Sequence, residues 1–539
     1  MVNGFSRSDA RSGPAPAAPV QAVQERSAES AWTIPLADLA ATEALARRIA
    51  EELKPGDLVA LSGGLGAGKT ALARAIVRAL SGDPALEVPS PTFTLMQDYD
   101  TPKGAVVHAD FYRLSGAQEL HELGWDEVTD PAIALVEWPE RAAEGLKSDR
   151  LAIALDLAGT GEGRVATLTA SGAFAPRLAQ WRALDTLLER SGWAEARRVP
   201  IFGDASVRAY LRLVRADGAT AILMIAPPRL VGPPVRRGRP YTAIAKLAET
   251  VHAFVAMDRG LRALGFSAPA IYGEALEAGL LVIEDLGDGG VVDADGPIPE
   301  RYGEATRLLA RLHGQRELPT VLPVSEERDH ALPPFDLEAL LIEAELLLDW
   351  YMPHILGVRP SGSVRAEFVN LWSDALMEVV AAPPTWTLRD YHSPNLIWLP
   401  ERQGLARVGL IDFQDAVLGH PAYDVASLLQ DARVTVPAEL ELKLLGLYAR
   451  ERRAGDPAFD TAGFARAYAI MGAQRATKIL GIFARLDKRD GKPQYLRHLP
   501  RIEAYLARDL AHPALERLKG WYDAVLPRLG AGAAEGEAR

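Results

Sequence analysis

The stretch GGLGAGKT at residues 63–70 decides the fold of the first part of the chain. The apolar run DLVALS at residues 57–62 precedes it, and residues 70–80 follow with apolar side chains at helical spacing. The stretch fits G-x-x-x-x-G-K-[ST], a pattern whose glycines let backbone N–H groups turn toward phosphates. A strand, a glycine-rich turn and a helix in this order predict an α/β fold with a P-loop that binds a nucleotide.

Each functional position of this loop has an expected role. Gly63, Gly66 and Gly68 are expected to wrap the backbone around the phosphates. Lys69 is expected to reach the β- and γ-phosphates of ATP, and the Thr70 hydroxyl to bind Mg²⁺. The helix that begins at Thr70 presents its positive end to the nucleotide. The loop therefore predicts ATP and Mg²⁺ as cofactors.

Two carboxylates follow further predicted strands. Asp110 comes after AVVHA, and Glu137 comes after AIALV. Ligands bind at the carboxyl ends of strands in open α/β sheets, so we expect one or both carboxylates at the metal or the attacking water. The runs at residues 151–157 and 164–170 are interpreted as additional edge strands.

Several linked runs in this part resemble the TsaE family, over residues 31–157. They are GGLGAGKTALARAIVRAL, VPSPTFTLMQDY, VVHADFYRL, ELGWDEV and IALVEWPER. TsaE proteins are small P-loop ATPases of bacterial tRNA threonylcarbamoyladenosine biosynthesis. The resemblance implies ATP hydrolysis together with TsaB- and TsaD-like proteins, and an indirect link to adenosine 37 of tRNA. One position departs mildly, since the family often has Asp where this chain has Gly64.

The same resemblance implies residue roles. Asp110 and Glu137 would serve the metal and the water, and Lys69 and Thr70 the nucleotide and Mg²⁺. Three further residues would lie beside this site, two of them in a switch-like loop: Thr92, Thr94 and Trp138.

The pattern changes near residue 175. A helix is predicted over residues 177–193, and a hairpin over residues 209–215 and 220–226 around Asp217-Gly218. Helical periodicity then dominates, for example over residues 241–264, 301–313 and 337–352. The second part is therefore expected to have a different, α+β fold.

This second part carries RDYHSPN at residues 389–395 and GLIDFQD at residues 409–415. Phosphoryl transfer from ATP needs a carboxylate near the acceptor hydroxyl, together with an Asn and an Asp that hold Mg²⁺. Asp390 is the predicted base, and Asn395 and Asp412 are the predicted metal ligands. Asp424 is interpreted as a scaffold residue for this loop, and Asp415 is left between a metal contact and solvent.

These motifs resemble the aminoglycoside phosphotransferase/choline kinase superfamily, whose members have a two-lobed protein-kinase-like fold. The runs GDASVRAYLRL, LVIEDLGD, LRDYHSPNLIWL, GLIDFQDAVLGHPAYDVASLLQDAR and QRATKILGIFARLDKRDGKPQYLRHLP resemble AmgK-type anomeric sugar kinases, over residues 177–529. The resemblance implies phosphorylation of N-acetylmuramic acid and N-acetylglucosamine at the anomeric hydroxyl, in peptidoglycan recycling. It places Gly203, Ser206 and Arg208 over the phosphates and Glu284 in the adenine-facing hinge.

One departure concerns the lysine that kinases carry on the third strand of the N-terminal lobe. The matching run AILMIA at residues 221–226 has none. Arg208 or Arg212 could supply this charge, because a guanidinium suits phosphate. The alternative is a weak kinase or a pseudokinase.

The sequence leaves several acceptors possible for the kinase. Gln474, Arg475, Lys478 and Arg485 fall on neighbouring turns of one predicted helix and could hold the carboxylate of an acidic sugar. A solvated helix face is the alternative. An aminoglycoside, choline or a homoserine-like alcohol would be favoured by an acidic pocket instead.

Composition sets the outer limits. The chain has 539 residues, a formal net charge of −12 and no cysteine, which excludes disulfides and thiolate metal sites. The acidic balance argues against a general nucleic-acid coat. There is no transmembrane segment and no secretory signal, so we expect a cytoplasmic protein without a membrane partner.

We expect four segments: a disordered tail over residues 1–30, the ATPase over residues 31–172, the kinase over residues 177–529 and a tail over residues 530–539. The chain is thus interpreted as two enzymes. The alternative for the first is an interaction module gated by nucleotide.

Overall fold

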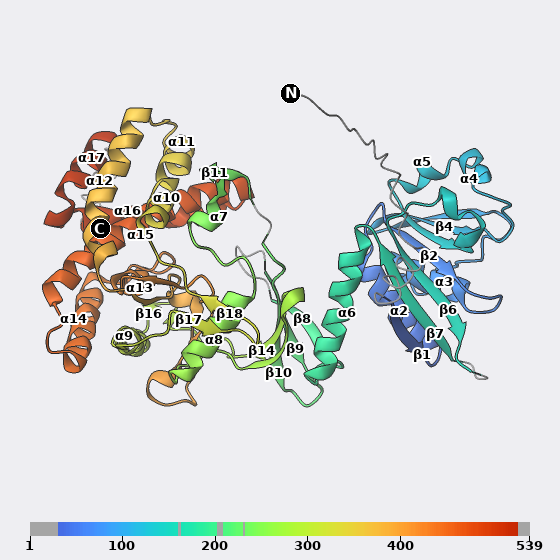
Figure 1. Cartoon of the computed structure of the whole chain (residues 1–539), viewed down its shortest axis with the longest axis horizontal. Coiled ribbons are helices and arrows are strands. Elements are labelled where there is room, and N and C mark those ends of the chain that lie inside the picture. Colours follow the sequence, from blue (N-terminus) through green and yellow to red (C-terminus); the bar gives the residue numbers. More distant parts are fainter. Residues whose placement is uncertain (1–30, 160–162, 202–207, 230–231, 527–539) are drawn as a thin grey trace, which may run out of the picture. The chain divides into compact units, whose positions relative to one another are not determined.

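A computed structural model of the chain describes residues 31–159, 163–201, 208–229 and 232–526 (Figure 1). The chain divides into two compact units, Met1–Thr186 and Leu187–Arg539. The helix α6 (Phe174–Arg190) runs across this boundary. The main apolar cores of the two units share no residue, so each unit is described by itself.

The first unit contains a seven-stranded sheet in the order β1-β7-β6-β2-β5-β4-β3. The four strands β6, β2, β5 and β4 are parallel to their neighbours within this group, and the outer pairs are antiparallel. The strand bounds are β1 (Trp32–Leu36), β2 (Leu58–Ser62), β3 (Met96–Thr101), β4 (Gly104–Asp110), β5 (Ile133–Glu137), β6 (Arg150–Leu157) and β7 (Arg164–Ser171). The α/β expectation is confirmed.

The prediction that residues 151–157 and 164–170 form edge strands is wrong. They form β6 and β7, which lie inside the sheet because β1 pairs with β7. The edges are β1 and β3, and β3 is a strand that we did not expect.

Side chains of β2 alternate between two apolar layers. Val59 and Leu61 join the core of α2 (Leu39–Glu52) and α3 (Lys69–Ser81), whereas Leu58 joins the core of α5 (Trp125–Thr129) on the other face. The short α4 (Gln118–Glu122) lies on the side of α5 and adds Leu120 to that core. Covered on both faces, β2 is the rigid support from which the P-loop emerges.

The second unit begins with an antiparallel sheet in the order β13-β14-β10-β9-β8. Its strands are β8 (Arg197–Ile201), β9 (Ala209–Val214), β10 (Thr220–Ile225), β13 (Ile271–Ala275) and β14 (Leu280–Glu284). The pairing of β9 with β10 confirms the predicted hairpin.

The helical periodicity predicted over residues 241–264 does not correspond to one continuous helix. The structure has α7 (Tyr241–Ile244) and α8 (His252–Ala263), with residues 245–251 between them. The chain turns at Lys246, whose φ is 57°, and the Lys246 ammonium lies 3.0 Å from the Asp336 carboxylate. Apolar spacing continues across this turn, so periodicity alone did not reveal the break.

The rest of the second unit is mainly helical. Its long helix α15 contains 30 residues and packs against α13 and α16. The helices are α9 (Pro299–His313), α10 (Leu337–Ala344), a π-helix (Leu347–Tyr351), α11 (Met352–Ile355), α12 (Gly362–Ala381), α13 (Ala422–Leu429), α14 (Ala438–Gly455), α15 (Thr461–Asp490), α16 (Leu499–Leu510) and α17 (Glu516–Val525). Short hairpins are β11 (Pro234–Arg236) with β12 (Arg239–Pro240), β15 (Val292–Asp293) with β16 (Gly296–Pro297), and β17 (Val321–Pro323) with β18 (Asp329–Ala331).

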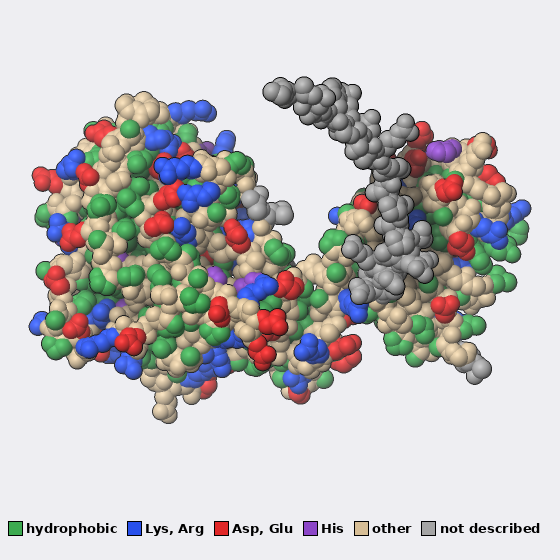
Figure 2. Space-filling model, viewed as in Figure 1, with side chains coloured by type: hydrophobic (Ala, Val, Ile, Leu, Met, Phe, Trp, Pro, Cys, Tyr) green, Lys and Arg blue, Asp and Glu red, His purple; other side chains and the backbone are tan. Residues whose placement is uncertain are grey.

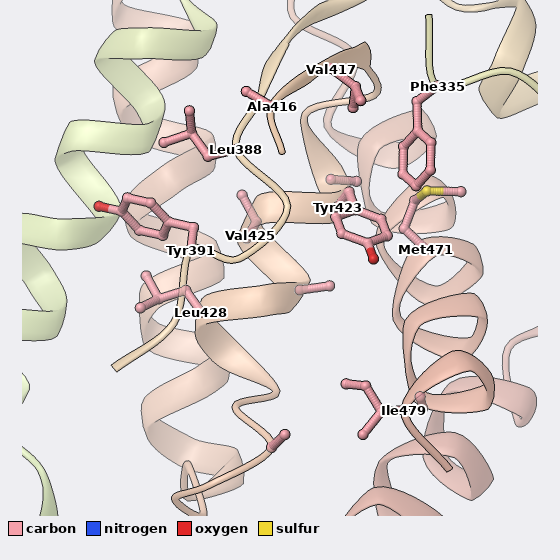
Figure 3. Packing of buried hydrophobic residues seen from close by; sticks show 14 of the residues in the cluster. Phe335, Leu388, Tyr391, Ala416, Val417, Tyr423, Val425, Leu428, Met471 and Ile479 are labelled. Carbon is pink, nitrogen blue, oxygen red and sulfur yellow. The ribbon is translucent and has the colours of Figure 1, made fainter. Parts of the chain in front are cut away.

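Two pairs of short strands hold the predicted kinase motifs. They are β19 (Thr385–Thr387) with β22 (Val417–Gly419), and β20 (Leu396–Trp398) with β21 (Val408–Leu410). Figure 3 shows Leu388 and Tyr391, which lie two residues before and one residue after Asp390, among buried side chains that include Val425 and Leu428 of α13. The loop that carries Asp390 is therefore fixed by apolar packing.

Charged side chains of both signs are interspersed on the visible face of each unit (Figure 2). Among the described residues, no helix has the length and apolar composition needed to cross a bilayer.

Asp258 in α8 gives a pH-dependent prediction. Its side chain is buried, its Oδ1 has no hydrogen-bond partner among the described residues, and burial raises its pKa from 3.8 to about 7. The folded state therefore binds a proton that the unfolded state releases, and stability falls as pH rises from about 4 to about 7. We expect Asp258→Asn to become progressively more stable than the wild type over this range, by up to about 4 kcal/mol.

Urea unfolding of the full chain at pH 5 and pH 8 measures this difference. Asp217→Asn, in an exposed turn, is the matched control and should show no such pH dependence. A constant difference between wild type and Asp258→Asn at both pH values would contradict the burial argument.

Candidate active sites

The P-loop of the first unit has a tightly constrained backbone. Gly63 has a φ of 138°, and a Cβ there would lie 2.4 Å from the carbonyl oxygen of Leu155, so only glycine fits. Gly68 has a φ of 107°, and α3 begins at the next residue. The strand, loop and helix predicted from GGLGAGKT are all present.

Lys69 lies inside this loop. Its Nζ donates to the carbonyl oxygens of Gly63 at 2.8 Å and Gly64 at 2.9 Å. The same Nζ lies 3.7 Å from the ring centroid of Trp138, a cation–π contact. Burial lowers the pKa of Lys69, although the charges of Glu137, Glu140 and Asp110 oppose that shift. The ammonium is thus held where phosphate oxygens can replace the two carbonyls.

Asp110 and Glu137 lie side by side at the ends of β4 and β5, where they are direct partners in the parallel register. The Thr70 hydroxyl donates to Glu137 Oε2 at 2.8 Å, and the Thr92 hydroxyl donates to Asp110 Oδ2 at 2.7 Å. The structure therefore gathers the predicted metal ligands and the switch-like loop at one edge of the sheet. Thr94 is exposed in the same loop.

His108 is a residue of this site that the sequence reasoning missed. Its Nε2 lies 3.0 Å from Glu137 Oε1, and its side chain is buried. The signal was its position in β4, two residues before Asp110, because alternate residues of a strand share a face. This contact between His108 and Glu137 orients the Glu137 carboxylate.

The second unit gathers the predicted kinase residues. Asn395 Nδ2 donates to the carbonyl oxygen of Asp390 at 2.9 Å and lies 3.5 Å from Asp412 Oδ2. Arg208 lies 3.2 Å from the other oxygen, Asp412 Oδ1. Asp390, Asn395 and Asp412 also line a common small cavity. Three polar groups from two separate motifs thus meet as phosphoryl transfer requires.

The loop around Asp390 is held in a strained form by Asp424. Arg389 in this loop has a φ of 67°, which is rare for residues other than glycine. Asp424 accepts from the backbone N–H groups of Leu388 at 2.7 Å and Arg389 at 2.8 Å, which confirms its predicted scaffold role. Asp415 also acts structurally, since it accepts from the N–H of Ala248 at 2.6 Å.

The pKa values of Asp390 and Asp412 are shifted in opposite directions. Burial alone would raise the pKa of Asp390, but the positive charges of Lys478 and Arg389 outweigh it and hold that pKa below its usual value. Burial and the repulsion from Asp390 raise the pKa of Asp412 to about 6. A cation bound at Asp412 would relieve this repulsion, so the residues present fit Mg²⁺.

Comparison with known proteins assigns the two units. The family model of the threonylcarbamoyl adenosine biosynthesis protein TsaE matches residues 36–165, and that of the phosphotransferase enzyme family matches residues 197–458. An N-acetylmuramate/N-acetylglucosamine kinase of Caulobacter vibrioides is 39% identical over 352 residues, which cover 63% of this chain and 95% of that protein. TsaE proteins of Rickettsia felis and Rickettsia prowazekii are each 42% identical over 99 residues, 18% of this chain and 57% and 68% of the respective relatives. The chain belongs to both families.

Only some of the other residues predicted to bind nucleotide in the phosphotransferase unit are described by the structure. Ser206 and Gly203 lie outside the described residues. Glu284 ends β14 and accepts from the N–H of Ala270 at 3.0 Å and from Arg402 at 2.5 Å. Arg212 contacts the carboxylates of Asp285 and Asp288, whereas Arg208 faces Asp412. Of the two arginines weighed as substitutes for the strand lysine, Arg208 is the one beside the metal ligands.

Of the cations predicted for the acceptor pocket of the phosphotransferase unit, Arg475 is buried and Lys478 and Arg485 are partly buried, and all three contact other groups of the protein. Lys478 lies 2.8 Å from Glu343 Oε1 and 3.1 Å from the Tyr423 hydroxyl. Arg485 stacks on the Tyr241 ring at 5.4 Å, and Arg475 lies 3.4 Å from the carbonyl oxygen of Gln430. Gln474 is fully buried and donates to the carbonyl oxygen of Leu340.

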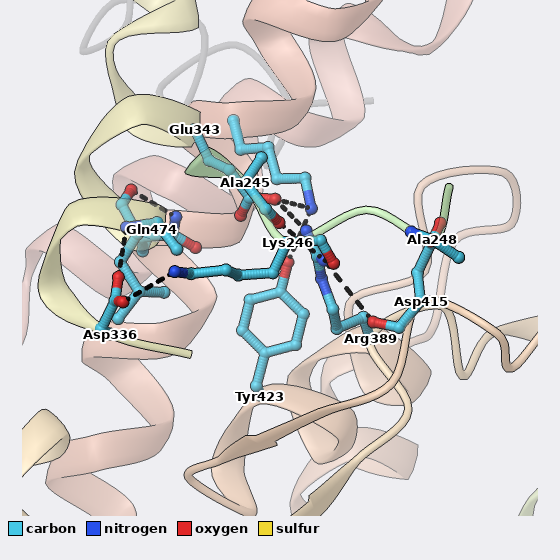
Figure 4. A network of polar contacts seen from close by, with 12 residues as sticks. Ala245, Lys246, Ala248, Asp336, Glu343, Arg389, Asp415, Tyr423 and Gln474 are labelled. Atoms are coloured by element: carbon cyan, nitrogen blue, oxygen red, sulfur yellow. Dashed lines mark hydrogen bonds and ion pairs between the residues drawn. The ribbon is translucent and has the colours of Figure 1, made fainter. Parts of the chain in front are cut away.

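Glu343 joins the catalytic loop to α15 (Figure 4). Its carboxylate pairs with both Arg389 and Lys478, and it is fully buried. Arg389 also donates to the carbonyl oxygen of Ala245 at 3.0 Å. The sequence analysis did not predict this network, because Glu343 lies in a segment without a motif and its contacts are long-range.

Removing Glu343 should be strongly destabilising. Glu343→Ala leaves Arg389 and Lys478 buried without their carboxylate, which typically costs about 3–5 kcal/mol. Thermal or urea unfolding of the phosphotransferase unit in the full chain measures this loss. Glu378→Ala breaks a surface pair with Arg466 and is the control, with an expected cost below about 1 kcal/mol. Equal losses for the two variants would show that Glu343 is not a structural support.

Proposed function

We propose that the phosphotransferase unit is an ATP-dependent kinase of N-acetylmuramate and N-acetylglucosamine that acts on the anomeric hydroxyl, in peptidoglycan recycling. The observation that carries this proposal is the meeting of Asp390, Asn395 and Asp412, in a chain that covers 95% of a kinase relative named for these two sugars. The sequence identity favours these sugars over an aminoglycoside or choline.

The residues have distinct roles in this proposal. Asp390, kept ionised by its neighbours, orients the sugar hydroxyl and accepts its proton. The sugar oxygen then bonds to the γ-phosphorus, the bond to the β–γ bridging oxygen breaks, and ADP leaves. Asn395 and Asp412 would hold Mg²⁺, which supplies charge stabilisation on the phosphates. Ser206, Arg208 and Glu284 are proposed to contact the nucleotide.

An acceptor panel tests this function. The full chain with MgATP is offered N-acetylmuramate, N-acetylglucosamine, kanamycin and choline, and the products are identified by mass spectrometry. Phosphorylation of the two amino sugars supports the proposal. Phosphorylation of kanamycin or choline alone would retain a kinase but refute the assigned acceptor, and no product at all would favour a pseudokinase.

We propose further that the TsaE unit hydrolyses ATP in concert with TsaB- and TsaD-like proteins and so supports threonylcarbamoyladenosine formation at A37 of tRNA. The pairing of Thr70 with Glu137, beside Lys69 and Asp110, supports a MgATP site. Gly63, Gly66 and Gly68 would wrap the phosphates, and Thr70, Asp110 and Glu137 would serve Mg²⁺ and the attacking water. ATP turnover that rises on addition of TsaB- and TsaD-like proteins is the expected result; turnover that never exceeds background with partners present would favour the interaction-module alternative.

A further inference from the structure

Arg433 lies beside the catalytic loop of the phosphotransferase unit and has a guanidinium without a carboxylate partner. Its NH1 is 3.4 Å from His392 Nδ1 and 3.5 Å from Nε2, and His392 follows Asp390 by two residues. Burial lowers the pKa of His392, which disfavours a second positive charge beside Arg433. Within the described part of the chain, Arg433 forms no ion pair. Its side chain is half-buried, which leaves part of it accessible to a ligand.

More positive charge surrounds Arg433. Arg501 lies 3.0 Å from His498 Nδ1, and Arg497 lies 3.3 Å from His498 Nε2. Burial and the charges of Arg501, Arg497 and Arg433 lower the pKa of His498. Neither Arg497 nor Arg501 has a carboxylate partner among the residues that the structure describes. We call Arg433, Arg497, His498 and Arg501 the arginine cluster.

The protein holds this cluster in place by contacts that do not neutralise it. Arg501 donates to the Thr435 hydroxyl at 2.7 Å and to the carbonyl oxygen of Ala432 at 2.9 Å, which fixes the segment that carries Arg433. The nearby carboxylate of Asp431 is fully buried and accepts from the backbone N–H groups of Ser393 and Arg433, both at 2.8 Å. Asp431 therefore ties the segment to the catalytic loop.

The cluster differs from the other cations near Asp390. Lys478 and Arg389 share Glu343, and Arg208 faces Asp412. Arg475 adds positive charge near His392, but it is 6% exposed and lies 3.4 Å from a backbone carbonyl. Among the described residues, Arg433 is thus the cation beside the catalytic loop whose guanidinium is accessible and forms no ion pair with a carboxylate. A guanidinium suits bidentate binding of a carboxylate.

From this geometry we infer that Arg433, supported by Arg501 and His498, binds the carboxylate of the acidic acceptor, the lactyl group of N-acetylmuramate. The inference rests on the proposed kinase function and assigns one substituent to one side chain. N-Acetylglucosamine lacks that carboxylate and therefore makes no use of this contact. Arg433 is then a specificity-determining residue and Arg501 a positioning residue.

The test crosses one substitution with one change in the substrate. Initial rates are measured for wild type and Arg433→Gln with MgATP and three acceptors: N-acetylmuramate, its methyl ester and N-acetylglucosamine. A charged hydrogen bond predicts that Arg433→Gln raises KM for the acid about 10- to 150-fold more than KM for the ester or N-acetylglucosamine. Arg433→Lys keeps the charge but not the planar guanidinium, so its KM for the acid should lie between those of wild type and Arg433→Gln. Arg517→Gln, an exposed arginine paired with Asp374, is the matched control and should leave all three KM values unchanged.

Each other outcome is decisive. An equal rise in KM for acid, ester and N-acetylglucosamine would assign Arg433 a merely structural role and overturn the inference. A wild type that phosphorylates N-acetylglucosamine but not N-acetylmuramate would overturn it as well and leave the kinase function intact. A wild type that phosphorylates neither sugar would overturn the proposed function, and the inference with it.

Discussion

Asp390→Asn is expected to abolish sugar phosphorylation by the full chain. Asparagine keeps the shape of the loop but cannot accept the proton of the acceptor hydroxyl, and loss of a general base typically lowers kcat by about 10²- to 10⁴-fold. Among the described contacts, the side chain of Asp390 forms no hydrogen bond that holds the loop. The bond from Asn395 goes to the backbone carbonyl oxygen of Asp390, which the substitution keeps. The variant should therefore fold normally.

Direct detection of the sugar phosphate measures this effect. Asp374→Asn, which alters an exposed pair with Arg517, is the control and should retain full activity. ATP hydrolysis by the TsaE unit should not change in either variant. Wild-type kcat in Asp390→Asn would remove Asp390 from the chemistry and require another base.

Lys69→Ala is expected to weaken nucleotide binding in the TsaE unit strongly. Lys69 is the cation positioned inside the P-loop, and a charged hydrogen bond to phosphate contributes about 1.5–3 kcal/mol, so ATP affinity should fall roughly 10- to 150-fold. The substitution also removes the contact with Trp138, so the tryptophan emission of the nucleotide-free protein should change.

ATP hydrolysis measured with TsaB- and TsaD-like proteins and without sugar, in an Asp390→Asn background, isolates the TsaE unit from the kinase. Lys54→Ala, at an exposed lysine of the same unit, is the matched control. Sugar phosphorylation in an otherwise wild-type chain should survive Lys69→Ala. Unchanged ATP turnover in the Lys69→Ala variant would contradict the assignment of the P-loop.

The parts that sequence predicted well are local. The P-loop needs eight consecutive residues, and Asp390 and Asn395 belong to one short motif, so their spacing already contains the geometry. Asp110 and Glu137 come from different strands, but both follow apolar runs, and the common direction of parallel strands brought them together.

The parts that sequence could not predict depend on long-range contacts. Glu343 and Arg389 are 46 residues apart, and nothing in either segment marks them as partners. The pairing of β1 with β7 moved β6 and β7 away from the edge of the sheet, which no local pattern encodes. Arg433 ends one of the runs that resemble the sugar kinases, but its position in the run did not indicate a role. The helical spacing of Arg475, Lys478 and Arg485 suggested a shared face, but not the protein contacts that these side chains make.

The most direct test of the two-enzyme interpretation is the position of the phosphate on the sugar. Full-length protein is incubated with MgATP and N-acetylglucosamine, and the product is examined by ³¹P–¹H correlation NMR. The account predicts a phosphorus coupled to the anomeric proton, absent with Asp390→Asn and present with Lys69→Ala. A phosphate on another hydroxyl, or no sugar phosphate from the wild type, would contradict the account.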